Sequence, residues 1–163
     1  MLRETDTTKA PVPVFDIARR LGVVLRVGPL PEELSGFLVR EGGKVVIGVN
    51  SLHPKQRQAF TVAHELGHLR LHRDDSFVDR GFSFYFRNQR SSQAVDQKEV
   101  QANQFAAELL MPAHLLEPLL NGRSVDVGDE HFISSLAKQF QVSSQAMTFR
   151  LINLGKAKRD TGN

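Results

Sequence analysis

The chain has 163 residues, of which 40% are hydrophobic and 24% are charged. This composition is typical of a globular protein, and the length suits one domain better than two. The chain has no cysteine, which excludes disulfides and thiolate metal sites, so a zinc site would need histidine and carboxylate ligands. The net charge of +3 is too small to indicate nucleic-acid binding by itself.

Targeting and membrane-spanning segments are not evident. The first ten residues are polar, and no run approaches the roughly 20 apolar residues that cross a bilayer. We therefore expect a cytoplasmic protein that does not contact a membrane, with residues 1–10 disordered.

The first predicted elements are one helix and a small sheet. Apolar residues at helical spacing over residues 14–21, followed by Gly22, predict a helix. Residues 23–27 are typical of a strand, and residues 36–40 and 44–49 flank a short Glu-Gly-Gly loop that predicts a hairpin. We expect a small antiparallel sheet. Its last strand lies either inside the sheet or at a free edge, where it could pair with an extended substrate.

The segment His64-Glu65-Leu66-Gly67-His68 has the form H-E-x-x-H within a predicted helix, residues 58–72. Two histidines four residues apart lie on one helix face and can converge on one zinc ion. Glu65 lies about 100° round the helix, so it is badly placed to bind the ion but can reach a water molecule beside it. These are the parts of a zinc hydrolase, typically a peptidase.

A catalytic zinc site normally has three protein ligands, so a third must come from elsewhere. His72 lies about 12 Å along the axis from His64, which favours a helix-end position for it instead. Residues 99–111 predict a second helix, on which Glu99 and Asn103 share a face. Glu99 could bind the metal and Asn103 could fix the tautomer of a ligating histidine. The alternative carboxylates are Asp74, Asp75, Asp96 and Glu108.

The segment between the two motifs alternates aromatic and polar residues over 81–87. This pattern fits a strand or a loop that covers a cleft. Tyr85, the only tyrosine, could stabilise an oxyanion by hydrogen bonding, although simple packing is the more ordinary interpretation.

The C-terminal part, residues 130–154, predicts two helices with a break at 141–143, where Ser143 can cap the second helix. Residues 136–147 resemble a helix-turn-helix. Arg150 is the only basic residue of the second helix, so we expect no direct DNA binding and favour packing or the docking of a protein partner.

The two central motifs resemble those of a known family. Residues 60–72 are similar to the signature helix of the ImmA/IrrE metallopeptidases, and residues 99–112 look like that family's second motif, E-x-x-A-N-x-F-A-A-x-L-L-M-P. The resemblance covers roughly residues 12–154. It implies one metal ion, zinc or alternatively manganese, with a general base beside it. The implied ligands are His64, His68 and Glu99, and the implied base is Glu65.

The resemblance also implies a fold and a function. We expect an α+β fold in which a small antiparallel sheet packs on a zincin-like helical core, followed by helix-turn-helix-like helices. The single metallopeptidase domain, 1–163, would comprise a core at 11–125 and a helical region at 126–155. The expected activity is that of a gluzincin-like endopeptidase that cleaves a helix-turn-helix repressor in a stress response, a mobile element or a toxin–antitoxin-like pair. The alternative is a regulator that binds a repressor or antitoxin without cutting it, with zinc in a structural role.

Overall fold

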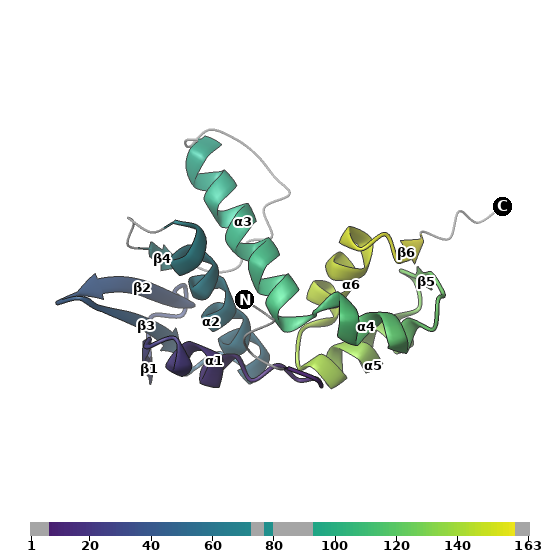
Figure 1. The fold of residues 1–163 in the computed structure, drawn as a ribbon, viewed down its shortest axis with the longest axis horizontal. Helices are drawn as coiled ribbons and strands as arrows, with labels where there is room; N and C mark the ends of the chain where they lie inside the picture. Colours follow the sequence, from purple (N-terminus) through teal and green to yellow (C-terminus); the bar gives the residue numbers. More distant parts are fainter. Residues whose placement is uncertain (1–6, 73–76, 80–92, 159–163) are drawn as a thin grey trace. The chain divides into compact units, whose positions relative to one another are not determined.

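The computed structural model describes residues 7–72, 77–79 and 93–158, whose elements are drawn in Figure 1. The chain divides into two compact units, one of residues 13–106 and the other of residues 1–12 with 107–163. Over the described residues the fold is α+β, with six helices and a small mixed sheet. The expected single domain, with its core and helical regions, stays a prediction.

None of the helices in the described part of the chain is long and apolar enough to cross a bilayer.

The unit of residues 13–106 combines the sheet with three helices that lie where the sequence predicts them, although α2 begins three residues and α3 six residues earlier than predicted. Its elements are α1 (Val14–Arg20), β1 (Val24–Gly28), β2 (Gly36–Glu41), β3 (Lys44–Asn50), α2 (Lys55–Leu71), β4 (Phe77–Asp79) and most of α3 (Gln93–Leu110).

The four strands lie in the order β1-β3-β2-β4, and the sheet is mixed. Strands β2 and β3 form the predicted antiparallel hairpin, and β4 is antiparallel to β2, but β1 is parallel to β3. The prediction of an antiparallel sheet was therefore wrong for β1. The loop of residues 29–35 carries the chain from β1 across the place that β3 later fills, so β3 returns between β1 and β2 and runs parallel to β1. Strand β3 is thus internal, and it has no free edge for a substrate.

Asn50, at the end of β3, holds this crossing loop in place. Its buried side-chain amide donates to the carbonyls of Leu30, Pro31 and Leu34 at 2.8–3.2 Å, and its oxygen accepts from the amides of Leu30 and Leu52. One side chain therefore replaces the backbone pairing that the loop lacks.

Helix α2 packs directly on one face of the sheet, where Leu38 and Ile47 are fully buried. A side chain on Gly36 would meet the Thr61 methyl and the Gly48 carbonyl at 2.5 Å, so glycine is needed where the helix crosses β2. Every residue of α2 from Phe60 to His68 is buried. This packing makes the motif helix part of the core.

The other unit is mainly helical. It contains the end of α3, then α4 (Ala113–Leu120), β5 (Val125–Asp126), α5 (Glu130–Phe140), α6 (Ser144–Asn153) and β6 (Ala157–Lys158), with β5 parallel to β6.

Helices α5 and α6 form where the sequence predicts them. The side chain of Asp129 caps α5 by accepting from Phe132 N, and that of Ser143 caps α6 by accepting from Ala146 N. Arg150 is buried on α6, and its Nε donates to the carbonyl of Met111 at 3.0 Å. The one basic residue of the second helix is therefore used in packing. The helix-turn-helix interpretation of this pair, like the zincin-like core, stays a prediction.

Candidate metal centre

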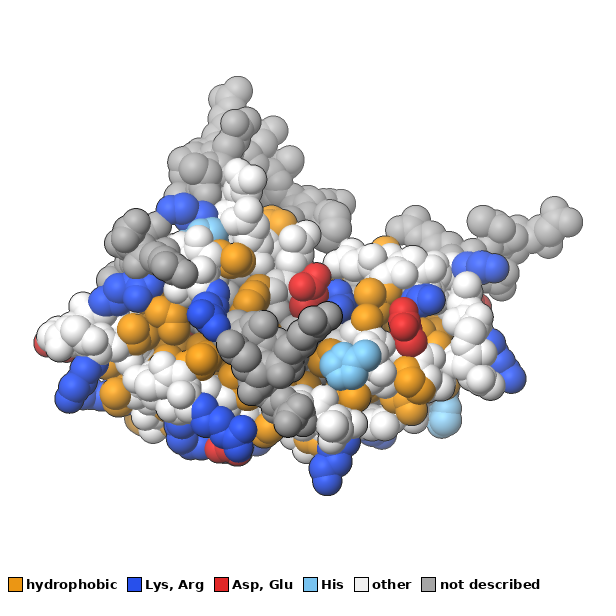
Figure 2. Space-filling model, viewed as in Figure 1, with side chains coloured by type: hydrophobic (Ala, Val, Ile, Leu, Met, Phe, Trp, Pro, Cys, Tyr) orange, Lys and Arg blue, Asp and Glu red, His pale blue; other side chains and the backbone are white. Residues whose placement is uncertain are grey.

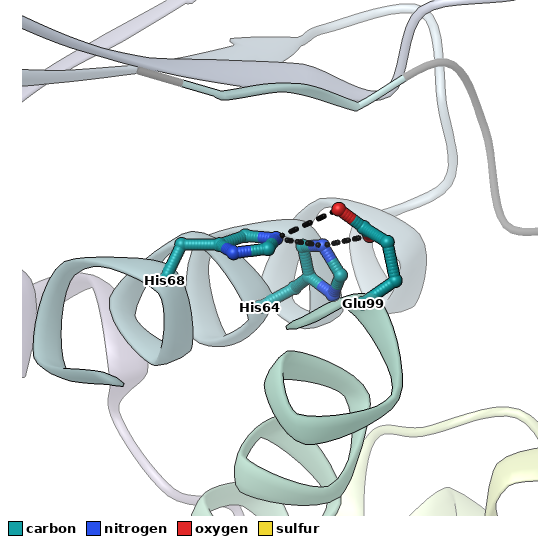
Figure 3. Close-up of side chains that lie close together, drawn as sticks. All are labelled: His64, His68 and Glu99. Atoms are coloured by element: carbon teal, nitrogen blue, oxygen red, sulfur yellow. Dashed lines mark hydrogen bonds and ion pairs between the residues drawn. The ribbon is translucent and has the colours of Figure 1, made fainter. Parts of the chain in front are cut away.

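Helix α2 supplies two imidazoles to the site. His64 and His68 are 2% and 1% exposed, and their rings lie edge to face with centroids 4.6 Å apart. Because they are four residues apart on one helix, both Nε2 atoms point to the same spot, 3.0 Å from each other. Figure 3 shows the two rings side by side on α2.

Helix α3 supplies a carboxylate to the same spot. Glu99 places Oε2 at 3.2 Å from His64 Nε2 and Oε1 at 3.2 Å from His68 Nε2 (Figure 3). The ligand atoms of the three residues all lie within 4.8 Å of one another, and among the described residues no other group of this kind occurs. The structure thus brings together the three residues that the motifs single out.

The other candidate carboxylates do not join this group. Glu108 is on the far part of α3 and lies 3.7 Å from Arg150 Nη1 instead. Asp74 and Asp75 lie outside the described residues, as does Tyr85, and the side chain of Asp96 is not described.

A close approach of α2 and α3 makes the convergence possible. A methyl group on Gly67 would lie 3.0–3.2 Å from the Ala102 backbone and Phe105 Cβ. Ala102 itself is fully buried. Two small residues, Gly67 and Ala102, therefore let the helices touch close to the residues that carry the site. The motif spacing does not show this contact, although the glycine within H-E-x-x-H is the signal that could have pointed to it.

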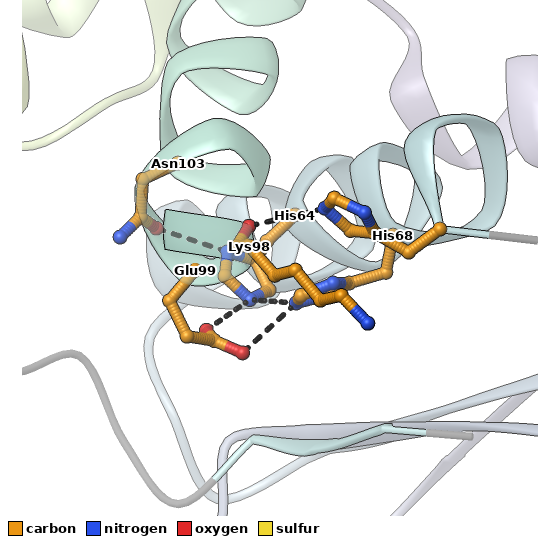
Figure 4. Close-up of polar contacts among 6 residues, drawn as sticks. His64, His68, Lys98, Glu99 and Asn103 are labelled. Atoms are coloured by element: carbon orange, nitrogen blue, oxygen red, sulfur yellow. Dashed lines mark hydrogen bonds and ion pairs between the residues drawn. The ribbon is translucent and has the colours of Figure 1, made fainter. Parts of the chain in front are cut away.

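Asn103 lies one turn after Glu99 and contacts His64 (Figure 4). Its Oδ1 is 2.9 Å from His64 Nδ1, and since a carbonyl oxygen only accepts, Nδ1 carries the proton. In the neutral ring this leaves a lone pair on Nε2, the atom that faces Glu99. Imidazole ligands of metals are usually oriented by such a partner.

The ionisation states also suit a metal ligand set. Burial by itself would raise the pKa of Glu99, but hydrogen bonds to His64 and His68 outweigh it and lower the pKa to about 2. Burial, together with the neighbouring His64, lowers the pKa of His68 despite the opposing effect of Glu99. At neutral pH the carboxylate is therefore ionised and the imidazole neutral, the forms that bind a cation.

The donor atoms are close enough to share one ion. The two Nε2 atoms are 3.0 Å apart, and each lies 3.2 Å from a different oxygen of Glu99, whereas two ligands of a tetrahedral ion with bonds of about 2.1 Å are about 3.4 Å apart. The His64 lone pair and the Glu99 oxygen are both acceptors, and two acceptors at 3.2 Å require a proton or a cation between them. Two nitrogens and a carboxylate are a common ligand set for zinc, and manganese also accepts them.

Glu65 follows His64 on α2 and is completely buried, but it is not part of the donor group. His72 ends α2 and is not part of the group either. Its side chain instead lies against α3, with Nε2 at 3.3 Å from the Lys98 carbonyl. Sequence reasoning placed His72 at a helix end, which the structure confirms, but missed this contact with the second helix.

Comparison with known proteins identifies a peptidase family that the chain matches. The profile of a peptidase family, described as the IrrE N-terminal-like domain, matches residues 18–152. An uncharacterized immunity region protein of Bacillus phage phi105 is 31% identical over 98 residues, which cover 60% of this chain and 58% of that protein. The radiation response metalloproteases IrrE of Deinococcus deserti and Deinococcus radiodurans are 35% and 33% identical over 106 residues, 65% of this chain.

The same matches cover 35% and 30% of the two Deinococcus proteins, so the chain corresponds to about a third of their length. A solved structure, a Mycobacterium tuberculosis transcriptional regulator, superposes with a TM-score of 0.61 at 18% identity. The match covers 90% of this chain and 42% of that one. At this identity the likeness shows a shared fold alone.

Proposed function

The chain belongs to the peptidase family of the IrrE N-terminal-like domain, and from this premise we propose that it is a metal-dependent endopeptidase. The observation that carries the proposal is the convergence of His64, His68 and Glu99 from two helices on one spot. Relatives whose names include metalloprotease support it.

The proposed metal ligands are His64 Nε2, His68 Nε2 and one oxygen of Glu99, and the ion is zinc, with manganese as a substitute. When bound in a site with three protein ligands, such an ion lowers the pKa of a coordinated water and polarises the substrate carbonyl. Asn103 would hold the ring of His64 in the tautomer that presents its Nε2 lone pair.

Glu65 is the proposed general base. It follows His64 in the chain, about 100° further round the helix, and its carboxylate is not among the donor atoms that converge. It would accept the proton of the attacking water and pass it to the amine of the leaving peptide. Its complete burial keeps solvent away from this transfer.

The substrate would bind as an extended segment along a sheet edge. Because β3 is internal, the free edges of the described sheet belong to β1 and β4. We favour β4, since the Glu99 carboxylate points towards this strand in both close-ups (Figures 3 and 4). An added strand gains main-chain hydrogen bonds there, and its side chains give specificity.

The proposed substrate is a helix-turn-helix transcriptional repressor, which would place the reaction in the cytoplasm. The names of the relatives refer to a phage immunity region and to the radiation response, which supports a regulatory setting. A stress response, a mobile element or a toxin–antitoxin-like pair would each need this activity.

The alternative function is a regulator that binds a repressor or antitoxin without cutting it. A structural zinc site normally has four protein ligands, whereas the described residues offer three in one group.

Direct binding to DNA is less favoured. Arg150 is buried, and the basic side chains in Figure 2 are scattered over the face shown rather than gathered in a stripe.

The test is to incubate the zinc-loaded protein with the helix-turn-helix repressor encoded nearest to it and to read the products by intact mass spectrometry. We expect one cut by the wild type. Glu65→Gln should keep zinc and lose about 10²–10⁴-fold in rate, as expected for loss of a general base.

Glu41→Gln, an exposed position in the β2–β3 hairpin, is the matched control and should cleave normally. If the wild type and the Glu65→Gln form both bind the repressor and leave it intact, the chain is better described as a regulator. Full activity of Glu65→Gln would disprove the assigned base.

A further inference from the structure

His72 occupies the junction between the two helices that carry the proposed ligands. It is the residue that ends α2, and its backbone N–H donates to the carbonyl of His68 at 2.9 Å. It is half-buried, and its ring nitrogens are not among the donor atoms that converge on the metal position. Its role must therefore differ from that of the two histidines before it.

The side chain of His72 contacts one proposed ligand, His68, and the backbone next to another, Glu99. Its ring centroid lies 5.4 Å from that of His68, tilted by 51°. Its Nε2 lies 3.3 Å from the backbone carbonyl of Lys98, the residue directly before Glu99. Because a carbonyl only accepts, His72 Nε2–H is the donor, which assigns the proton to this nitrogen.

Glu99 is the ligand that most needs such support. It is 41% exposed, whereas the two ligating histidines are buried in the core. A glutamate side chain loses much rotamer entropy when it is fixed, and a metal bond tolerates displacements of only about 0.2 Å. The backbone at Lys98 and Glu99 lies about one turn before Ala102, so the close contact of Gly67 with Ala102 does not itself hold that backbone.

We propose, on the basis of the proposed metal site, that His72 is a positioning residue that links the end of α2 to α3 at Lys98 and so sets the place of Glu99. The hydrogen bond to Lys98 fixes the backbone that carries the ligand. The ring contact with His68 holds the His72 side chain in place beside that ligand.

Glutamine and asparagine give a matched pair of substitutions. The Nε2 of glutamine is the same number of bonds from the backbone as the Nε2 of histidine, so His72→Gln can still donate to the Lys98 carbonyl. The side-chain nitrogen of asparagine is one bond closer and falls short. Both are neutral polar residues, and because asparagine and glutamine differ in their preference for helix ends, the stability of the metal-free variants is measured separately.

The experiment is a zinc titration of the full chain against a chromophoric chelator, with the visible spectrum of the cobalt form as a second readout. We expect His72→Asn to weaken zinc binding by about tenfold and to alter the cobalt spectrum, as for loss of a group that orients a ligand. His72→Gln should restore both. The two variants should unfold at about the same temperature when metal-free.

Wild-type zinc affinity and an unchanged cobalt spectrum in His72→Asn would overturn the proposal, and so would equal losses in both variants. Glu99→Ala is measured in the same titration. If it binds zinc as the wild type does, the ligand set itself is wrong and both proposals fail. If it loses zinc while His72→Asn does not, the positioning role alone fails.

Discussion

The two helices that carry the candidate ligands hold them in different ways. His64 and His68 lie inside a stretch of α2 that is buried from end to end, and they are 2% and 1% exposed. Glu99 on α3 is 41% exposed. Core packing therefore fixes the histidine pair before any metal binds, while the carboxylate depends on how α3 crosses α2. Substitutions on α2 should affect both stability and metal binding, and those at Glu99 metal binding alone.

The largest effect is expected for His64→Ala. It removes a buried ring, leaves a cavity and deprives Asn103 of its hydrogen-bond donor, so the metal-free protein should lose about 2–4 kcal/mol of unfolding free energy. Zinc affinity should fall by at least about a hundredfold, more than for loss of an orienting group. Denaturant unfolding with chelator and zinc titration measure the two effects. His131→Ala, exposed on α5, should change neither.

Glu99→Ala should lower zinc affinity but leave the stability of the metal-free protein nearly unchanged. Zinc binding should again weaken by about a hundredfold, because a ligand is lost. The unfolding free energy of the metal-free protein should change by less than about 1 kcal/mol, since the contacts of a partly exposed carboxylate are screened by solvent. Glu108→Ala, at the other candidate carboxylate of α3, is the control and should keep zinc affinity. A loss of zinc in that variant instead would move the third ligand.

Gly67→Ala tests the crossing of the two helices. Alanine favours a helix by about 1 kcal/mol over glycine, but the added methyl would press on Ala102 and Phe105 at 3.0–3.2 Å. We expect a net loss of about 1–3 kcal/mol and weaker zinc binding, because α3 must move away. Gly28→Ala, where the new methyl has open space, is the control. A more stable Gly67→Ala protein with normal zinc affinity would show that the crossing can relax.

The smallest expected effect is the change with pH in the stability of the metal-free protein. The pKa of His68 is lowered from 6.5 in the folded metal-free protein, so the unfolded chain takes up a proton that the folded protein does not. Stability from this group is therefore complete above about pH 6.5 and is lost as the pH falls below it. The pKa of Glu99, about 2, adds a second loss only below about pH 4.5.

Unfolding of the metal-free protein at pH 8, 6.5 and 5 would measure the first step. His68→Gln should flatten the decline between pH 6.5 and 5, and His131→Gln should leave it. A decline of equal slope in His68→Gln would assign the step to another group.

The histidine pair of the candidate site could be predicted from helical spacing, whereas spacing left several carboxylates open for the third position and the family resemblance singled out Glu99. His64 and His68, and again Glu99 and Asn103, are pairs four residues apart, and such pairs share a helix face in any fold. The helices themselves follow from apolar spacing and local capping, as at Ser143. These properties are local, so the sequence carries them without reference to distant residues.

Tertiary structure alone decided which elements became neighbours. The hairpin could be predicted, but the parallel pairing of β1 with β3 depends on the path of the crossing loop that Asn50 holds. The burial of Arg150 against Met111 and the reach of His72 to Lys98 likewise join residues far apart in the chain. The amino-acid sequence by itself determined which side chains share a face. Packing determined which faces meet, because that choice depends on non-local contacts that no local spacing encodes.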